Sequence, residues 1–412
     1  MNVSRGSTLR LDSLEEDLDV EGSSKVICSG PNSTLRVSGQ VRCEGTVEFE
    51  GSVTCEEFRG ENCSVTITSL STRSLRIDDG SIEIMQDLKC ESIDVDKQLT
   101  VRGKIEASSI DVGGKFELNS VKAESADVGG TFRAEGDVDI EDIDVGGVVE
   151  IRGKVNSRRL EVGGKARLSG GTVSDSVEVG GIFESSQPLS FGNIEVGGVV
   201  TLKGPSEGKD IDVGGRIKVD GDLSCRNLEI GGWAEVSGSL KGSAVEVGGR
   251  LSVGHSLLLS DSLEVGGSIN IGGDAQARSV EIRGSLKCKS LKVESAEFSG
   301  HATTESGVYS TGPITVSRKS RVEGWLRSLE QVSIEARSEV DSVYAPRINI
   351  EKAARAKNLY GDEISIERGV EVSGEIMYTK EVRSDEPFGS NRIRSTPTKV
   401  DSIPEAIRQP SR

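Results

Sequence analysis

One tetrapeptide, an acid followed by Val or Ile and then two glycines, recurs ten times in the middle of the chain. The acids of these tetrapeptides are Asp111, Asp127, Asp144, Glu161, Glu178, Glu195, Asp212, Glu229, Glu246 and Glu264. They recur at a nearly constant interval of about 17 residues, and only the first step is one shorter and only the last step is one longer. Such regular spacing indicates a repeat architecture, so the 412 residues are read as one repeated unit rather than as several globular domains.

Within each repeat, apolar residues alternate with polar ones in three short runs. In the repeat that begins at Ile143, the inward positions would be Ile143 and Val145, then Val149 and Ile151, then Val155. Alternation with a period of two is typical of β-strands, and glycine or polar residues between the runs are typical of tight corners. The Gly-Gly pair predicts a corner in which at least one residue has a positive φ or no room for a Cβ. The sequence therefore predicts an all-β fold, a single-stranded parallel β-helix solenoid with triangular coils of about 17 residues.

The same alternation of apolar and polar residues, at the same interval, extends beyond the Gly-Gly repeats in both directions. We expect a continuous β-helix over residues 26–383, with regular Gly-Gly coils at 93–290 and further coils at 296–383. Residues 1–25 are acidic and irregular, which predicts a flexible segment or, as an alternative, a short capping helix. Residues 384–412 contain four prolines among polar residues, which predicts a disordered tail.

Composition restricts the partners and the compartment. A formal charge of −17 argues against nucleic acid and anionic lipid as primary partners, because both require a basic surface. The seven cysteines form no C-x-x-C pair and mostly alternate with aliphatic residues, so we expect reduced core residues. Reduced thiols favour a cytoplasmic location. The chain also shows no signal-peptide-like start and no apolar stretch of transmembrane length.

The ten tetrapeptide acids lie between inward residues, so we expect them to form an outward column with a spacing of about 4.8 Å. Neighbouring carboxylates at that distance repel by ~0.9 kcal/mol in water before screening. One hypothesis is that the column binds divalent cations or a partner. The alternative is a solvated face that is balanced by nearby basic residues and that opposes lateral aggregation. These basic residues are Lys115, Lys165, Arg216 and Arg250.

The sequence offers little for catalysis. Its two histidines, His255 and His301, exclude a three-histidine metal site, and no Gly-rich loop is followed by Gly-Lys-[Ser/Thr]. The coils differ only slightly in length, which leaves no long loop to build a cleft. We therefore expect no enzyme activity, no catalytic residues and no cofactor.

The last coils share a phrase that begins with [VI]-x-I-E and ends in tyrosine, at Tyr344, Tyr360 and Tyr378. This phrase resembles bactofilins and the wider polymer-forming cytoskeletal family, especially its archaeal members. The resemblance implies a right-handed β-helix and nucleotide-independent, head-to-head and tail-to-tail assembly into nonpolar filaments. It also implies a scaffold role in cell shape, envelope growth or the positioning of partners. The chain has more coils than the usual core of this family and lacks the short hydrophobic N-terminal anchor of many members. Membrane association is therefore left open, with the inner face of the membrane as an alternative to the free cytoplasm.

An end coil exposes strand edges and an apolar cross-section, which a solenoid must cap or use. The candidate polymer interface is the C-terminal coil, with Val370, Val372, Ile376 and Tyr378. The three tyrosines of the phrase are expected to stack. The leading hypothesis is a structural, self-polymerising scaffold whose partners are copies of itself and cell-envelope or other scaffolded proteins. The alternative is a monomeric β-solenoid, a binding scaffold or surface protein that recognises a partner or polysaccharide along one face.

Overall fold

The computed structural model describes residues 1–386 and contains two compact units, the first ending at Lys209 and the second beginning at Asp210. Each unit is a β-solenoid of parallel strands. Together they contain about 23 turns of roughly 17 residues and essentially no helix. The predicted fold class is therefore confirmed.

The first unit contains the 3-10 turn η1 (Pro31–Ser33) and 25 strands. These strands are β1 (Asn2–Val3), β2 (Thr8–Leu11), β3 (Ser13–Leu14), β4 (Leu18–Glu21), β5 (Ser24–Cys28), β6 (Thr34–Val37), β7 (Gln40–Thr54), β8 (Glu57–Ser71), β9 (Ser74–Asp78), β10 (Ser81–Ile84), β11 (Leu88–Lys89), β12 (Ser92–Val95), β13 (Gln98–Glu106), β14 (Ser109–Val112), β15 (Lys115–Val128), β16 (Thr131–Ala134), β17 (Val138–Val145), β18 (Val148–Ile151), β19 (Val155–Val162), β20 (Lys165–Leu168), β21 (Gly171–Val179), β22 (Ile182–Ser185), β23 (Leu189–Val196), β24 (Val199–Lys203) and β25 (Ser206–Glu207).

The described part of the second unit has the same pattern, with strands of at most five residues before the long strands near its end. These strands are β26 (Asp210–Val213), β27 (Arg216–Asp220), β28 (Leu223–Ser224), β29 (Asn227–Ile230), β30 (Trp233–Val236), β31 (Leu240–Gly242), β32 (Ala244–Val247), β33 (Arg250–Val253), β34 (Leu257–Leu259), β35 (Ser262–Val265), β36 (Ser268–Ile271), β37 (Asp274–Gln276), β38 (Ser279–Ile282), β39 (Ser285–Cys288), β40 (Ser290–Val293), β41 (Ser295–Phe298), β42 (His301–Thr304), β43 (Val308–Ser310), β44 (Ile314–Val316), β45 (Arg321–Glu323), β46 (Leu326–Ser328), β47 (Gln331–Ile334), β48 (Glu339–Ile350), β49 (Arg355–Ile366), β50 (Glu371–Val372) and β51 (Ile376–Ser384).

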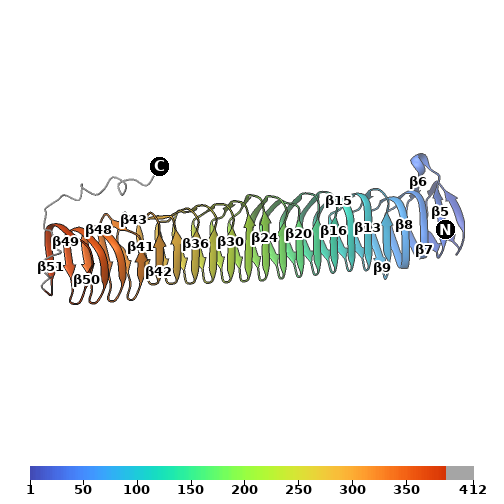
Figure 1. Ribbon diagram of the computed structural model, residues 1–412. Coiled ribbons are helices and arrows are strands. Elements are labelled where there is room, and N and C mark those ends of the chain that lie inside the picture. Colours follow the sequence, from blue (N-terminus) through green and yellow to red (C-terminus); the bar gives the residue numbers. More distant parts are fainter. Residues whose placement is uncertain (387–412) are drawn as a thin grey trace. The chain divides into compact units, whose positions relative to one another are not determined.

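Each turn has three sides, because three strands pass before the chain returns to the first side. In the second unit, β26, β27 and β28 make one turn, and β29 then pairs in parallel with β26. Within each unit the ribbon shows the strands of successive turns side by side (Figure 1). Each side of a unit is therefore a parallel sheet whose strands come from consecutive turns.

The inward side chains stack in register from turn to turn. Ile143 faces Leu160 and Val145 faces Val162 in the next turn, and all four are at most 1% exposed. Parallel strands covered on both faces usually need apolar residues throughout. Here only the inward side is covered, so apolar and polar residues alternate. The prediction that Ile143 and Val145 point inward while Asp144 points outward is confirmed.

The Gly-Gly corners are explained by space rather than by backbone conformation. No glycine of the ten Gly-Gly pairs has a positive φ. A Cβ on Gly147 would instead collide with the carbonyl oxygen of Gly130, the equivalent residue one turn earlier. The second of the two predicted reasons for the Gly-Gly pair is therefore the correct one.

The core is narrow and largely aliphatic, with a few phenylalanines at matching heights. The rings of Phe116 and Phe132, in successive turns, stack with centroids 5.2 Å apart. All seven cysteines are buried and free. Burial raises the pKa of the Cys90 thiol to about 11, so these thiols behave as small apolar core residues.

The expectation of a flexible segment or helix at residues 1–25 is corrected by the structure, which places four strands and the start of a fifth there. Val3 is paired with Val20, Leu18 is paired with Val41, and all four side chains are buried. The interval from Leu18 to Val41 is longer than the usual step between turns, since the intervening turn accommodates η1. Because this turn is longer, it interrupts the regular interval between repeats in the sequence. At the other end β51 closes at Ser384, and the predicted disordered tail falls almost wholly on residues 387–412, outside the described residues.

Candidate interaction surfaces

The predicted column of acids forms an acidic ladder in each unit, defined as the outward acids on the first side of successive turns. In the first unit it comprises Asp94, Asp111, Asp127, Asp144, Glu161, Glu178 and Glu195. In the second unit it comprises Asp212, Glu229, Glu246, Glu264, Glu281 and Glu297. Each acid is the register partner of the next, so the carboxylates repeat at the strand spacing of about 4.8 Å.

Few cations neutralise the ladder. Among residues 1–386, ion pairs reach only two of its acids: Arg76 lies 3.6 Å from Asp94, and Arg283 lies 2.7 Å from Glu281. Partial burial and the repulsion of Asp127 and Asp94 raise the pKa of Asp111. The ten acids of the repeated tetrapeptide thus form no ion pair with any described residue.

Three of the four basic residues that were expected to balance the column contact other side chains. The Lys115 ammonium lies 2.7 Å from Glu117, and the Lys165 ammonium lies 3.0 Å from Glu184, both on the neighbouring side of the solenoid. The Arg216 guanidinium lies 5.2 Å from the centre of the Trp233 ring. The prediction of a face balanced by these cations therefore does not match the contacts that they make.

A metal role for the ladder is not supported by its geometry. In the part of the chain that the structure describes, no group of three or more His, Cys, Asp or Glu side chains is arranged to hold a metal ion. One carboxylate per turn in a straight row supplies few ligands at any one point, whereas calcium takes six to eight oxygen ligands. Cation binding by the ten tetrapeptide acids stays a prediction.

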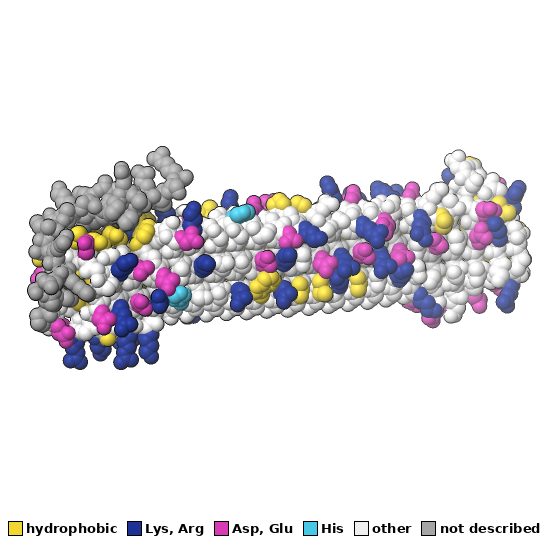
Figure 2. All heavy atoms as spheres, viewed as in Figure 1, with side chains coloured by type: hydrophobic (Ala, Val, Ile, Leu, Met, Phe, Trp, Pro, Cys, Tyr) yellow, Lys and Arg dark blue, Asp and Glu magenta, His cyan; other side chains and the backbone are white. Residues whose placement is uncertain are grey.

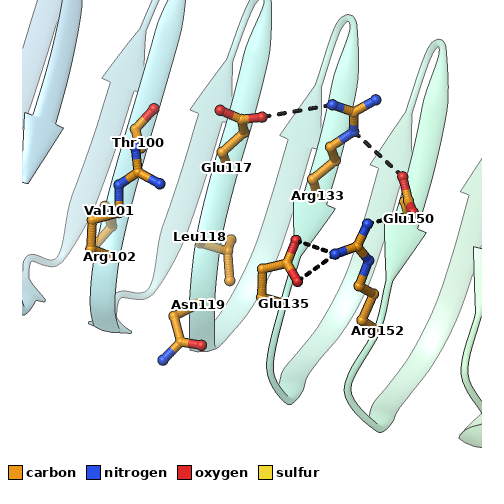
Figure 3. A pocket seen from close by; sticks show the side chains of 10 residues that line it. All are labelled: Thr100, Val101, Arg102, Glu117, Leu118, Asn119, Arg133, Glu135, Glu150 and Arg152. Atoms are coloured by element: carbon orange, nitrogen blue, oxygen red, sulfur yellow. Dashed lines mark hydrogen bonds and ion pairs between the residues drawn. The ribbon is translucent and has the colours of Figure 1, made fainter.

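The next side of the first unit carries a second ladder in which the charge alternates. Arg133 lies between Glu117, at 3.8 Å, and Glu150, at 3.5 Å, and Arg152 lies 2.8 Å from Glu135 (Figure 3). These side chains line a shallow groove of about 400 Å³ across β13, β15, β16 and β18. Its charges already neutralise one another, so the groove presents little unpaired charge to a ligand. Sequence reasoning missed this ladder, although the alternation of acid and base from one repeat to the next was visible.

The candidate polymer interface lies on the last described turn, on β50, β51 and the corner before them. Ile376 is 1% exposed, whereas Val370, Val372 and Tyr378 are half-buried. In the preceding turn, Ala354 is fully buried. The four predicted residues are thus brought together on one turn, and its inward positions are less well covered than those of an interior turn.

The tyrosines stack only in part. The rings of Tyr344 and Tyr360 are parallel, with centroids 4.6 Å apart. Tyr378 does not join them, because Met377 is the register partner of Tyr360 and Tyr378 faces Gly361. Met377 therefore occupies the place of the third tyrosine, and Tyr378 follows one residue later, outside the stack.

The glutamate of the C-terminal phrase has a structural role that the sequence analysis missed. Its carboxylate accepts a hydrogen bond from a backbone N–H in the corner of the preceding turn. The four pairs are Glu335 with Arg318 at 3.1 Å, Glu351 with Ala336 at 3.1 Å, Glu367 with Lys352 at 3.0 Å and Glu386 with Gly369 at 3.3 Å. For the first three glutamates, their recurrence directly after [VI]-x-I was the available signal, whereas Glu386 lies beyond the phrase.

Comparison with known proteins adds no name: no family model, no curated protein and no solved structure matches the chain. A search of the described residues for a helix long and apolar enough to cross a membrane found none.

Proposed function

We propose that this protein is a structural scaffold that polymerises with copies of itself into filaments, without nucleotide, by stacking of its end turns. The observation that carries the proposal is the last described turn, where Val370 and Val372 occupy inward positions but are only half-buried. Interior turns bury the same positions almost completely, since a neighbouring turn covers each of their faces. A turn from a second copy would give these valines the same cover, and apolar burial contributes roughly 25 cal/mol per Å².

The repeated phrase of the last turns gives independent support, because its resemblance to polymer-forming cytoskeletal proteins concerns these same turns. Its glutamates tie each corner to the preceding one, so the end turn is supported as a surface rather than left as a loose edge. The seven buried, unpaired thiols fit a reducing compartment, and we place the protein in the cytoplasm, with the inner face of the membrane as the alternative site. In such a filament, each outward position would recur once per turn, and this repeating surface would be available to cell-envelope or other scaffolded partners.

The test is a single charge at the end turn. Val372→Arg would place a guanidinium between two stacked ends, where an uncompensated buried charge costs about 3–5 kcal/mol. We expect this variant to keep its strand content by circular dichroism and to stop at short oligomers in negative-stain microscopy and sedimentation. The matched control is Ser373→Arg, which adds the same charge at the adjacent exposed position and should leave the filaments unchanged. Full-length filaments from a folded Val372→Arg protein, or no filaments from the unmodified protein, would contradict the proposal.

A second candidate function is a monomeric scaffold that binds a partner along one face. The acidic ladder favours it, because most of its carboxylates form no ion pair with a described residue and together they make a repetitive binding surface. A single monomeric species over a wide concentration range in sedimentation velocity would favour this candidate over the filament.

A further inference from the structure

The C-terminal turns carry a basic corner, defined here as Lys319, Arg337, Lys352 and Arg368. These residues lie in the first corner of four successive turns, between β44 and β45, β47 and β48, β48 and β49, and β49 and β50. All four are exposed, and none forms an ion pair with a residue among 1–386. Lys and Arg side chains gather along the lower edge of the C-terminal turns (Figure 2, dark blue). The chain as a whole has a net charge of −17, so this edge is opposite in sign to the chain as a whole.

Each of these four corners presents at least one exposed cation. The N–H of Lys319 donates to the carbonyl of Ala336 at 3.3 Å, and the N–H of Arg337 donates to the carbonyl of Lys352 at 3.2 Å. Lys319 and Arg337 are themselves the left-handed residues of their corners, with φ values of 62° and 64°, whereas Lys352 and Arg368 each directly precede the left-handed residue. The acids beside this corner accept hydrogen bonds from backbone N–H groups, as Glu351 does from Ala336. Their carboxylates are turned toward the backbone, and the cations project beyond them.

The Gly-Gly turns present the complementary surface. There the same corner consists of two glycines, so a strip without side chains runs beside the acidic ladder. The ladder acids Asp144, Glu161 and Glu178 are exposed and form no ion pair with any described residue. Both surfaces repeat once per turn, and each turn advances by the same strand spacing of about 4.8 Å. A projecting row of cations on one copy can therefore match a row of carboxylates on another copy in both sign and repeat.

We propose that the basic corner of one copy docks along the acidic ladder of the first unit of a second copy, which joins copies side by side. This contact is distinct from the stacking of end turns and does not depend on it, because two single copies can form it. The contact pairs the cations of the basic corner with the carboxylates of the acidic ladder, so both rows gain ion pairs at once. Anionic lipid would also attract the cations, but its headgroups have no fixed spacing that matches the turns, so the second copy is the better partner.

Charge-reversed variants of the full chain test the contact. The corner variant carries Arg337→Glu, Lys352→Glu and Arg368→Glu. The ladder variant carries Asp144→Lys, Glu161→Lys and Glu178→Lys. The control variant makes the same change in net charge as the corner variant at exposed lysines outside the corner, with Lys241→Glu, Lys287→Glu and Lys292→Glu. Circular dichroism verifies that each variant retains its strands.

Sedimentation velocity is measured at about 0.01 M and about 1 M salt, where the Debye length falls from about 30 Å to about 3 Å. We expect the unmodified protein and the control variant to associate side by side in low salt and to separate in high salt. The corner variant alone, and the ladder variant alone, should each need a protein concentration about tenfold or more higher before they associate. An equimolar mixture of these two variants should associate, because each then supplies the charge that the other needs.

Three results would overturn the proposal: no salt-sensitive association of the unmodified protein, unchanged association of the corner variant, or no association in the mixture of variants. Vesicles that contain phosphatidylserine provide the other comparison. Should the corner variant lose vesicle binding while its association in solution stays normal, the partner is a lipid surface and the proposal is wrong. Val372→Arg separates the two proposals, since it should shorten filaments without removing the side-by-side contact.

Discussion

The carboxylate of Glu351 accepts a hydrogen bond of 3.1 Å from the backbone N–H of Ala336, which lies in the corner one turn earlier. A corner leaves its N–H groups without the ladder partners that a strand provides, and an unpaired buried donor is costly. The same contact recurs in neighbouring turns, as in Glu367 with the N–H of Lys352. The glutamate of the C-terminal phrase is therefore a cap for the preceding corner.

This contact predicts a local loss of stability on truncation. Glu351→Ala leaves the amide of the buried Ala336 without its acceptor, which should cost about 1–3 kcal/mol in opening free energy at this corner. Hydrogen exchange of the Ala336 amide should accelerate accordingly. The control is Glu339→Ala, whose carboxylate pairs with the exposed Arg321 at 3.5 Å, where a surface ion pair contributes little. Equal exchange rates in both variants would contradict the capping role.

The two glycines of one corner should differ in their tolerance of a side chain. A Cβ on Gly267 would collide with the carbonyl oxygen of Gly249, whereas a Cβ on Gly266 would have its nearest neighbour at 3.7 Å. Neither glycine has a positive φ, so only space separates them. We expect Gly267→Ala to lower the free energy of unfolding by about 1–3 kcal/mol, as overpacking does, and Gly266→Ala to change it little. Denaturant unfolding measures both. A greater loss from Gly266→Ala would mean that the stacking of these corners is misassigned.

The buried thiols should be nearly inert in the native protein. Burial raises the pKa of Cys55 to about 11 and that of Cys225 to about 12, from an ordinary value of 9.0. Because the thiolate is the reactive form, a rise of about two pKa units leaves about a hundredfold less of it near neutral pH. An aromatic disulfide reagent should react slowly with the native chain and with all seven thiols after denaturation. Ser373→Cys, at an exposed position, supplies the fast-reacting control. Rapid native reaction of several thiols would show that the turns open readily.

Two carboxyl groups should give opposite responses to pH. The pKa of Asp111 is raised by partial burial and by its acidic neighbours, so its charge opposes folding at neutral pH. Asp111→Asn should therefore raise the melting temperature at neutral pH, and the gain should disappear as the pH falls through the folded pKa of Asp111 toward its unfolded value of about 3.9.

Glu106 is the matched comparison, because its hydrogen bond to Lys104 lowers its pKa. A lowered pKa contributes stability above the unfolded value of about 4.3, and that stability is lost as the pH falls through the folded pKa. Glu106→Gln should lower the melting temperature at neutral pH by a small amount, since the pair is exposed, and should match the unmodified protein in acid. Shifts of the same sign in both variants would contradict these assignments.

The sequence was sufficient for the fold because one periodic signal recurs in nearly every turn. Alternating apolar residues predict strands, and the constant interval between repeats places Ile143 over Leu160 without further information. The prediction failed in the first turns, since the corner that contains η1 lengthens the interval and breaks the phase. It also failed for Tyr378, where a single extra residue moves the side chain out of the stack that Tyr344 and Tyr360 form.

The surfaces were harder to predict than the core, because outward side chains can choose among several partners. The position of the acidic ladder follows from the repeat, but the lack of ion pairs at its ten tetrapeptide acids does not. Lys115 and Lys165 are close in sequence to ladder acids and yet pair with Glu117 and Glu184 on the next side. The corner glutamates were equally hidden, since Glu351 acts on a backbone group of another turn rather than on a side chain.

The pairing of each residue with its equivalent one turn away has a consequence for how such a chain changes over evolutionary time. In the first unit Asp144 faces Glu161 and Glu161 faces Glu178, so removal of the residues from one acid to the next would bring Asp144 opposite Glu178 with no change of phase. Duplication of the same stretch would likewise leave the inward positions of the core in register. Gene length is therefore free to drift in whole-turn steps, while an insertion of one residue within a strand turns every following side chain of that strand inside out.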